Sequence, residues 1–206
     1  MPETTQLSRD LAQPRNFFEL RLTSWPYEQR LTVGGSIAKT GLGLEIWVDG
    51  QHLDEPHSID LLLFVQSLHE SGWFEIFTCG CGVGGCAGIV EGIQVTHDAG
   101  LVTWSFRRPQ SAGNLNDSAV SDWEKTAVPV VFTFERRQMV EAIQNCLHEI
   151  GTLVDGDLSR FDWYVNGPSI QEILNIDPNK PVYEILDGEW KCQCNKVSPS
   201  NGWSGP

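Results

Sequence analysis

The chain has few basic residues for its number of acidic ones. Its 206 residues include 14 Lys+Arg against 27 Asp+Glu, which gives a formal net charge of −13 at pH 7 and an isoelectric point near 4.7. A surface with this charge repels nucleic acid and anionic membranes and attracts basic partners. We therefore expect a basic protein as the partner, and neither a nucleic acid nor a membrane.

Long apolar segments are also missing. The longest apolar run, residues 61–65, has five residues, whereas a membrane-spanning helix needs about 20. Residues 1–20 lack the apolar stretch of a secretory signal peptide. The expectation is a cytoplasmic protein, in which the six cysteines are thiols or metal ligands rather than disulfides.

Common catalytic motifs are missing as well. The five histidines form neither H-x-x-x-H nor H-E-x-x-H, and the sequence has no G-x-S-x-G and no P-loop lysine. His97 and Asp98 fall in a predicted turn, where neighbouring side chains rarely bond to each other as a base and its orienting acid. We predict no catalytic residue, and an enzyme of unknown type is kept only as an alternative.

Residue patterns predict many short strands and few helices. Strands are predicted at residues 16–23, 42–48, 51–53, 73–78, 88–96, 101–107, 128–135 and 161–165, with hairpin turns at residues 49–50 and 97–100. A helix is predicted at residues 58–71, capped by Ser58, and the clearest one at residues 136–150, ended by Gly151. A third, short helix is predicted at residues 169–176.

This order of elements predicts an α+β fold with mostly antiparallel sheets, two to three helices and a single domain. A length of 206 residues is usual for one domain. We place the domain at residues 16–194, between a flexible N-terminus at residues 1–15 and a flexible tail at residues 195–206.

The most unusual stretch is FTCGCGVGGCAGI at residues 77–89, which holds three cysteines and five glycines. Its glycines match the G-x-G-x-x-G of dinucleotide-binding loops, but a strand is predicted where such a loop requires a helix. Phosphate binding is therefore a poor interpretation. A redox pair of Cys79 and Cys81 would lack the helix start that usually activates a C-x-x-C thiol.

Two further interpretations of this stretch are open. Cys79, Cys81 and Cys86 could converge on a zinc ion, because glycines allow the tight backbone that a metal knuckle needs. Cys192 and Cys194 form a second C-x-C that could supply a fourth ligand. Alternatively, the stretch is a tight connection whose buried cysteines act as small apolar residues.

Residues 74–106 resemble a motif of uncharacterised bacterial proteins. In that family a Thr-Cys-x-Cys-Gly-x-x-Gly-Cys-x-Gly block precedes a strand, a His-Asp turn and a strand with Trp. The matching residues are Thr78, Cys79, Cys81, Gly82, Gly85, Cys86, Gly88, His97, Asp98 and Trp104. The resemblance implies a small cytosolic bacterial protein and no particular reaction, and the second C-x-C lies outside it.

Eight tryptophans are many for this length. Most lie in predicted strands and should be buried, but Trp123 lies in a polar loop and Trp203 in the tail. An exposed Trp is a common anchor at protein interfaces. We therefore expect a non-enzymatic, acidic protein that binds a basic protein, for example an immunity protein that neutralises a basic toxin domain. A structural zinc module is the alternative.

Overall fold

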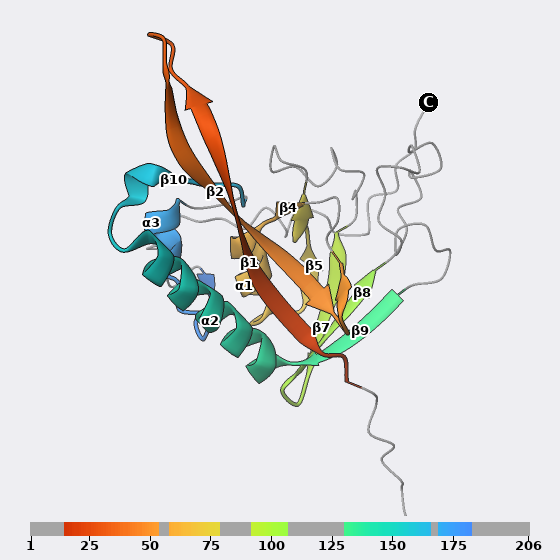
Figure 1. Ribbon diagram of the computed structural model, residues 1–206. Helices are drawn as coiled ribbons and strands as arrows, with labels where there is room; N and C mark the ends of the chain where they lie inside the picture. The colour runs from red at the N-terminus through yellow and green to blue at the C-terminus, as the bar shows by residue number, and fades with distance from the viewer. Residues whose placement is uncertain (1–14, 54–57, 79–91, 107–129, 166–168, 183–206) are drawn as a thin grey trace, which may run out of the picture.

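The computed structural model describes residues 15–53, 58–78, 92–106, 130–165 and 169–182 (Figure 1). In these ranges mostly antiparallel strands combine with three helices, which confirms the predicted α+β fold. None of the helices in these ranges has the length and apolar character needed to cross a bilayer.

The strands pair in three sheets. They are β1 (Phe18–Arg30), β2 (Ser36–Val48), β3 (Gln51–His52), β4 (Ser58–Ile59), β5 (Gly72–Phe74), β6 (Phe77–Thr78), β7 (Ile93–Asp98), β8 (Leu101–Phe106), β9 (Val130–Glu135) and β10 (Phe161–Trp163). One sheet has the order β1-β2-β10, with β3 also on β2; another has the order β5-β7-β8-β9; β4 pairs with β6. The pair of β2 and β10 is parallel, unlike the other described pairs.

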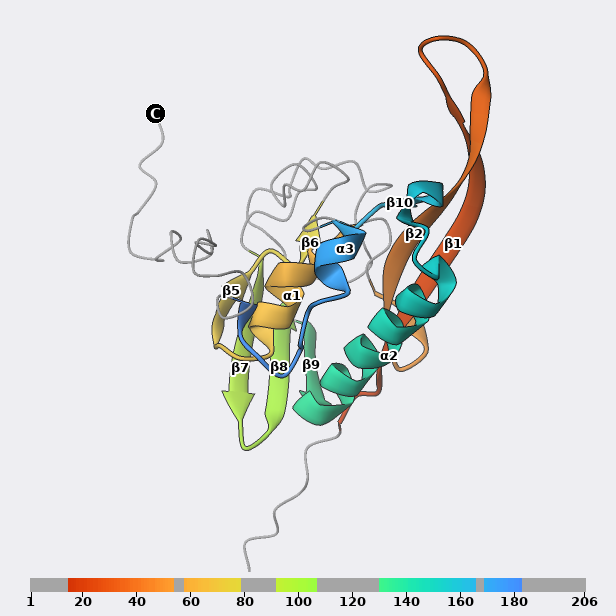
Figure 2. The same ribbon diagram turned by 90° about the vertical axis from the view of Figure 1, so that its left-hand side faces the viewer.

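The helices cover the sheets from one side. They are α1 (Leu61–Ser67), α2 (Arg136–Val154) and α3 (Ile170–Ile173), with the 3-10 turn η4 at Leu158–Arg160. Figure 2 shows α2 running along the β1–β2 hairpin, and α1 lying in front of β7 and β8. The main core fills the space between these elements.

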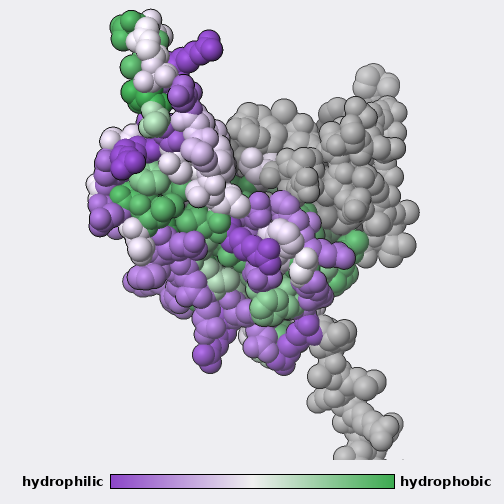
Figure 3. All heavy atoms as spheres, in the orientation of Figure 1, coloured by the Kyte–Doolittle hydropathy of each residue, from purple (hydrophilic) through white to green (hydrophobic). Residues whose placement is uncertain are grey.

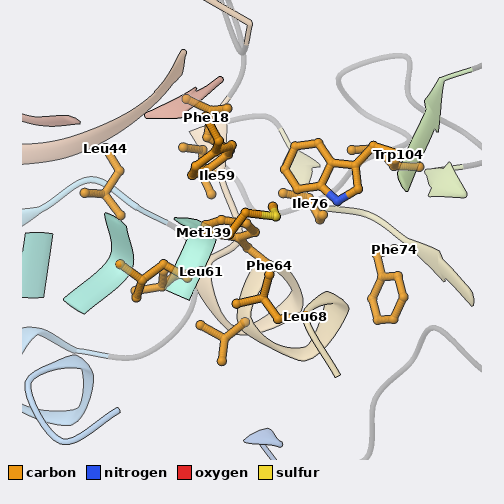
Figure 4. Close-up of a cluster of buried hydrophobic side chains, with 14 of the residues drawn as sticks. Phe18, Leu44, Ile59, Leu61, Phe64, Leu68, Phe74, Ile76, Trp104 and Met139 are labelled. Carbon is orange, nitrogen blue, oxygen red and sulfur yellow. The ribbon is translucent and has the colours of Figure 1, made fainter. Parts of the chain in front are cut away.

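Trp104 on β8 is central to this core (Figure 4). It is fully buried, and its ring centroid lies 6.0 Å from that of Phe18 on β1 and 5.7 Å from that of Phe64 on α1. Phe134 on β9 packs against it at 5.3 Å. All three contacts are edge-to-face, the arrangement that aromatic rings prefer. One residue therefore joins the hairpin, a helix and the second sheet.

The helix α2 confirms the clearest sequence prediction, apart from its end. The buried residues recur at three- and four-residue spacing: Met139, Val140, Ile143, Cys146, Ile150 and Val154. The expectation that Gly151 ends the helix is wrong. Gly151 lies inside the helix, where a Cβ atom would make only an ordinary contact, 3.6 Å from the Leu174 side chain. The helix ends instead at Val154, and its C-cap, Asp155, has a φ of 40°.

The helix α1 is shorter than predicted. Its N-cap is Asp60, whose carboxylate accepts a hydrogen bond from the Leu63 N–H at 2.9 Å. The predicted cap, Ser58, lies instead in β4, opposite Thr78 on β6. The strand predicted at residues 73–78 is accordingly two strands, because β5 pairs with β7 while β6 pairs with β4.

The last described segment returns to α1. Gln66 on α1 is buried, and its side-chain oxygen accepts the N–H of Val182 at 2.8 Å. His69 Nε2 lies 3.1 Å from the Pro178 carbonyl, to which it must donate. Its other ring nitrogen, Nδ1, lies 3.2 Å from an Arg136 nitrogen and therefore accepts. These bonds hold the segment across the end of the helix.

Candidate functional site

The residues singled out for chemistry lie outside the described ranges. These are the cysteines Cys79, Cys81, Cys86, Cys192 and Cys194 and the tryptophans Trp123 and Trp203. The structure therefore does not show whether the thiols converge, and the zinc site stays a prediction. In the described part of the chain, no group of three or more His, Cys, Asp or Glu residues could hold a metal ion.

The sixth cysteine, Cys146, is buried on the apolar face of α2. Burial raises the pKa of its thiol to about 12, and nearby Glu149 raises it further. Because a thiolate is the form that binds metal, Cys146 is unsuited to that role.

We expect any zinc binding to depend on the cysteine-rich stretch at residues 77–89. If the stretch holds a structural zinc ion, purified protein should contain about one zinc per chain, and Cys81→Ser should lose it. Cys146→Ala is the matched control and should keep the metal. Elemental analysis with thiol titration measures both. Metal-free protein whose thiols all titrate freely would contradict the zinc hypothesis.

His97 and Asp98 contribute to structure in a way the sequence did not show. The predicted hairpin turn at residues 97–100 is shorter in the structure, because His97 and Asp98 lie in β7 and Asp98 pairs with Leu101. The His97 Nε2 lies 2.9 Å from the Ser67 carbonyl and 3.1 Å from that of Glu70, so the ring donates to the carbonyls at the end of α1. Donors at this position satisfy carbonyls that the helix leaves open. The Nε2 N–H of His97 is therefore already bonded to backbone carbonyls.

Among the acidic residues in the described ranges, Asp60 has the most strongly shifted carboxyl pKa. Burial raises the pKa of its carboxyl group to about 6; the Leu63 and Leu62 N–H groups lower it in part, and Glu75 raises it. Perturbed acids often mark active sites. A reaction, however, needs a second group in a defined position. Asp60 is instead accounted for as the cap of α1.

The clearest unoccupied surface is the outer half of the β1–β2 hairpin, residues 24–39, which we call the arm. The two strands have 13 residues each. Residues 28–38 are all exposed. At about 3.4 Å per residue, the arm extends roughly 20 Å beyond the part of the hairpin that is buried against the rest of the protein. Figure 1 shows it projecting from the body.

The turn of the arm is well defined. The Gly34 N–H donates to the Leu31 carbonyl at 3.1 Å, and the Leu31 N–H donates to the Gly35 carbonyl at 3.0 Å. Gly34 has a φ of 89°, which glycine adopts without strain and which closes three-residue hairpin loops. These two hydrogen bonds close the loop Thr32-Val33-Gly34 at the tip.

The tip is apolar although it is exposed. Val33 is 92% exposed, and Leu31 and Ile37 are each 40% exposed. Figure 3 shows hydrophobic residues at the end of the arm, and others among polar residues on the body. Exposed apolar groups that cluster on a projecting element are typical of interaction sites.

An aromatic group lies at the base of the arm. The Trp25 ring is 5.1 Å from that of Tyr164, and Tyr27 is 6.2 Å from Tyr164. Trp25 lies over Gly41, where an added Cβ would overlap the indole. Trp25 and Tyr164 stay 39% and 51% exposed, so the rings present a surface to solvent.

Sequence analysis did not identify the arm. The dipeptide Gly34-Gly35 is a turn signal that would have located its tip. Comparison of the chain with protein-family models, with curated proteins and with solved structures finds no match. Proposals for its function therefore depend on the residues of this chain.

Proposed function

We propose that the protein is a non-enzymatic, acidic binding protein whose arm contacts another, basic protein. The observation that carries the proposal is the exposed apolar tip formed by Leu31, Val33 and Ile37. An isolated two-stranded hairpin is only marginally stable in water. Covering the apolar side chains of the arm in an interface removes them from water, which favours binding.

The charge of the chain favours a protein as the partner. A net charge of −13 opposes binding to nucleic acid and to anionic membranes, and it accelerates encounters with a basic protein. An immunity protein that blocks a basic toxin domain in the cytoplasm combines these properties. Such a protein needs complementary shape and charge, and no reaction of its own.

We expect Val33→Asp to weaken this binding at least tenfold, which is about 1.4 kcal/mol. A carboxylate at the tip would lose its water in an apolar interface. Wild-type protein is used to capture partners from its source cell at low salt, and each captured protein is identified and purified. Calorimetry then compares the wild type, Val33→Asp and the control Thr96→Asp, which adds the same charge on an exposed position of β7.

The proposal requires that the captured protein be basic and that its binding weaken as salt rises from about 0.1 to 1 M. Thr96→Asp should bind as the wild type does. If no protein binds the purified wild-type chain, or if the protein that binds is acidic, the proposed function is wrong.

A further inference from the structure

The register of the hairpin also indicates how the arm docks, an inference that rests on the proposed function. We infer that one face of the arm, together with its tip, enters an apolar groove of a different protein, that basic side chains flank this groove, and that the β1 edge of the arm stays unpaired.

The two faces of the arm differ. Paired residues of adjacent strands share a face, and successive residues alternate. The register pairs Trp25 with Gly41, Tyr27 with Lys39 and Gln29 with Ile37. One face therefore carries Trp25, Tyr27, Leu31 and Ile37, which we call the apolar stripe. The polar residues Gln29 and Lys39 lie on the same face.

The opposite face of the arm is polar. It carries Ser24, Pro26, Glu28, Arg30, Ser36 and Ala38. Farther in, the same face is apolar where it packs against α2, as the burial of Phe18 and Leu44 shows. The apolar stripe is on the side away from α2, so the helix cannot cover it, whereas a partner protein can.

The edge of β1 is poorly suited to adding a strand. At the inner end the Asp49 N–H donates to the Phe17 carbonyl, and at the outer end the Leu31 N–H donates to that of Gly35. Alternation from these two points directs the backbone N–H of every even-numbered residue of β1 away from β2. Pro26 falls at such a position and has no N–H, a common protection against edge pairing.

A second copy of the chain is an unsuitable occupant. Each copy carries a net charge of −13, so two copies repel each other. The inner part of the face that carries the apolar stripe has a small negative excess. Arg21 is paired with Glu19 and Lys39 with Asp162, so Glu45 leaves one net negative charge there. Positive charge on a partner complements this excess.

Neighbouring residues of β2 test the inference. Ile37 and Ala38 are both exposed, and they lie on opposite faces. Against the protein captured above, Ile37→Asp should raise the dissociation constant at least tenfold, and Ala38→Asp less than about threefold. Pro26→Val restores an N–H to the edge and should leave the constant within about twofold. Equal losses from the two β2 variants, or tighter binding by Pro26→Val, would overturn the inference.

Photo-crosslinking distinguishes this inference from the proposed function. Benzoylphenylalanine replaces Val33, or Asp98 at the tip of the β7–β8 hairpin. The inference requires an adduct from position 33 to apolar residues of a basic protein, and none to that protein from position 98. An adduct from position 33 to polar residues of a basic protein would retain the proposed function and overturn the inference. A basic partner reached only from position 98, or an adduct between two copies of the chain, would overturn both. An absence of any adduct would overturn both.

Discussion

Trp104→Ala should lower the free energy of unfolding by about 3–5 kcal/mol, the usual cost of removing a large buried aromatic side chain. For a chain of this size, the melting temperature should fall by on the order of 10 °C. The cost is high because Trp104 is fully buried and packs against rings from β1, α1 and β9. No single neighbour can move into the cavity without breaking another contact.

Trp104→Phe should cost much less, about 1–2 kcal/mol. A phenyl ring keeps most edge-to-face contacts. It also removes the buried indole N–H, which has no hydrogen-bond partner in the described part of the chain and so weakens the folded state. Urea unfolding of the three proteins measures the series. If Trp104→Ala and Trp104→Phe cost the same, the aromatic contacts are not the source of stability.

Asp60→Asn should stabilise the protein at pH 7. The carboxyl group has a pKa of about 6 in the folded chain against 3.8 ordinarily, which corresponds to about 3 kcal/mol. Burial is the main cause, because the ionised form loses water in the folded state. Asparagine keeps an oxygen that can accept the Leu63 N–H, so the helix cap survives. We expect a gain of about 1–3 kcal/mol.

The gain should depend on pH. The folded carboxyl group holds its proton more tightly than the unfolded one, so the wild type loses stability as pH rises from about 4 to 6. Below about pH 4 both states are protonated and the penalty vanishes. The advantage of Asp60→Asn should therefore be small at about pH 4 and complete above about pH 7. An equal difference at both values, from urea unfolding, would contradict the burial of this charge.

Much of the fold follows from local patterns. The helix α2 was predicted because its apolar residues, from Met139 to Ile150, recur at helical spacing. The strands β8 and β9 were predicted because they alternate and are rich in β-branched and aromatic residues. The turn at Asp49-Gly50 correctly predicted the pairing of β2 with β3.

The sequence-based predictions were wrong where contacts between residues far apart in the sequence determine the structure. Ser58 could cap a helix by its residue type, but its pairing with Thr78 places it in a strand. The parallel pairing of Phe161 with Thr40 has no local signal at all. The arm was missed because Pro26 and Gln29 interrupt the alternation of Trp25, Tyr27 and Leu31 with polar residues.

The candidate site was not predicted from the sequence. Composition and charge favoured a protein-binding function, which stays a prediction, and the contact residues expected, Trp123 and Trp203, lie outside the described ranges. The apolar stripe depends on the register of β1 with β2, which a single sequence does not specify without the position of the turn. An exposed valine in a loop becomes informative only when its hairpin is seen to project.

Hydrogen exchange of the arm, with and without the captured basic protein, tests whether the arm is the contact surface. The N–H groups that join β1 to β2 in the arm exchange when the hairpin opens, and a two-stranded hairpin is only marginally stable, so they should exchange rapidly in the free chain. Binding should hold the hairpin closed and slow exchange at residues 24–39 more than elsewhere in the described chain. Unchanged exchange in the arm, with protection confined to other segments, would contradict it.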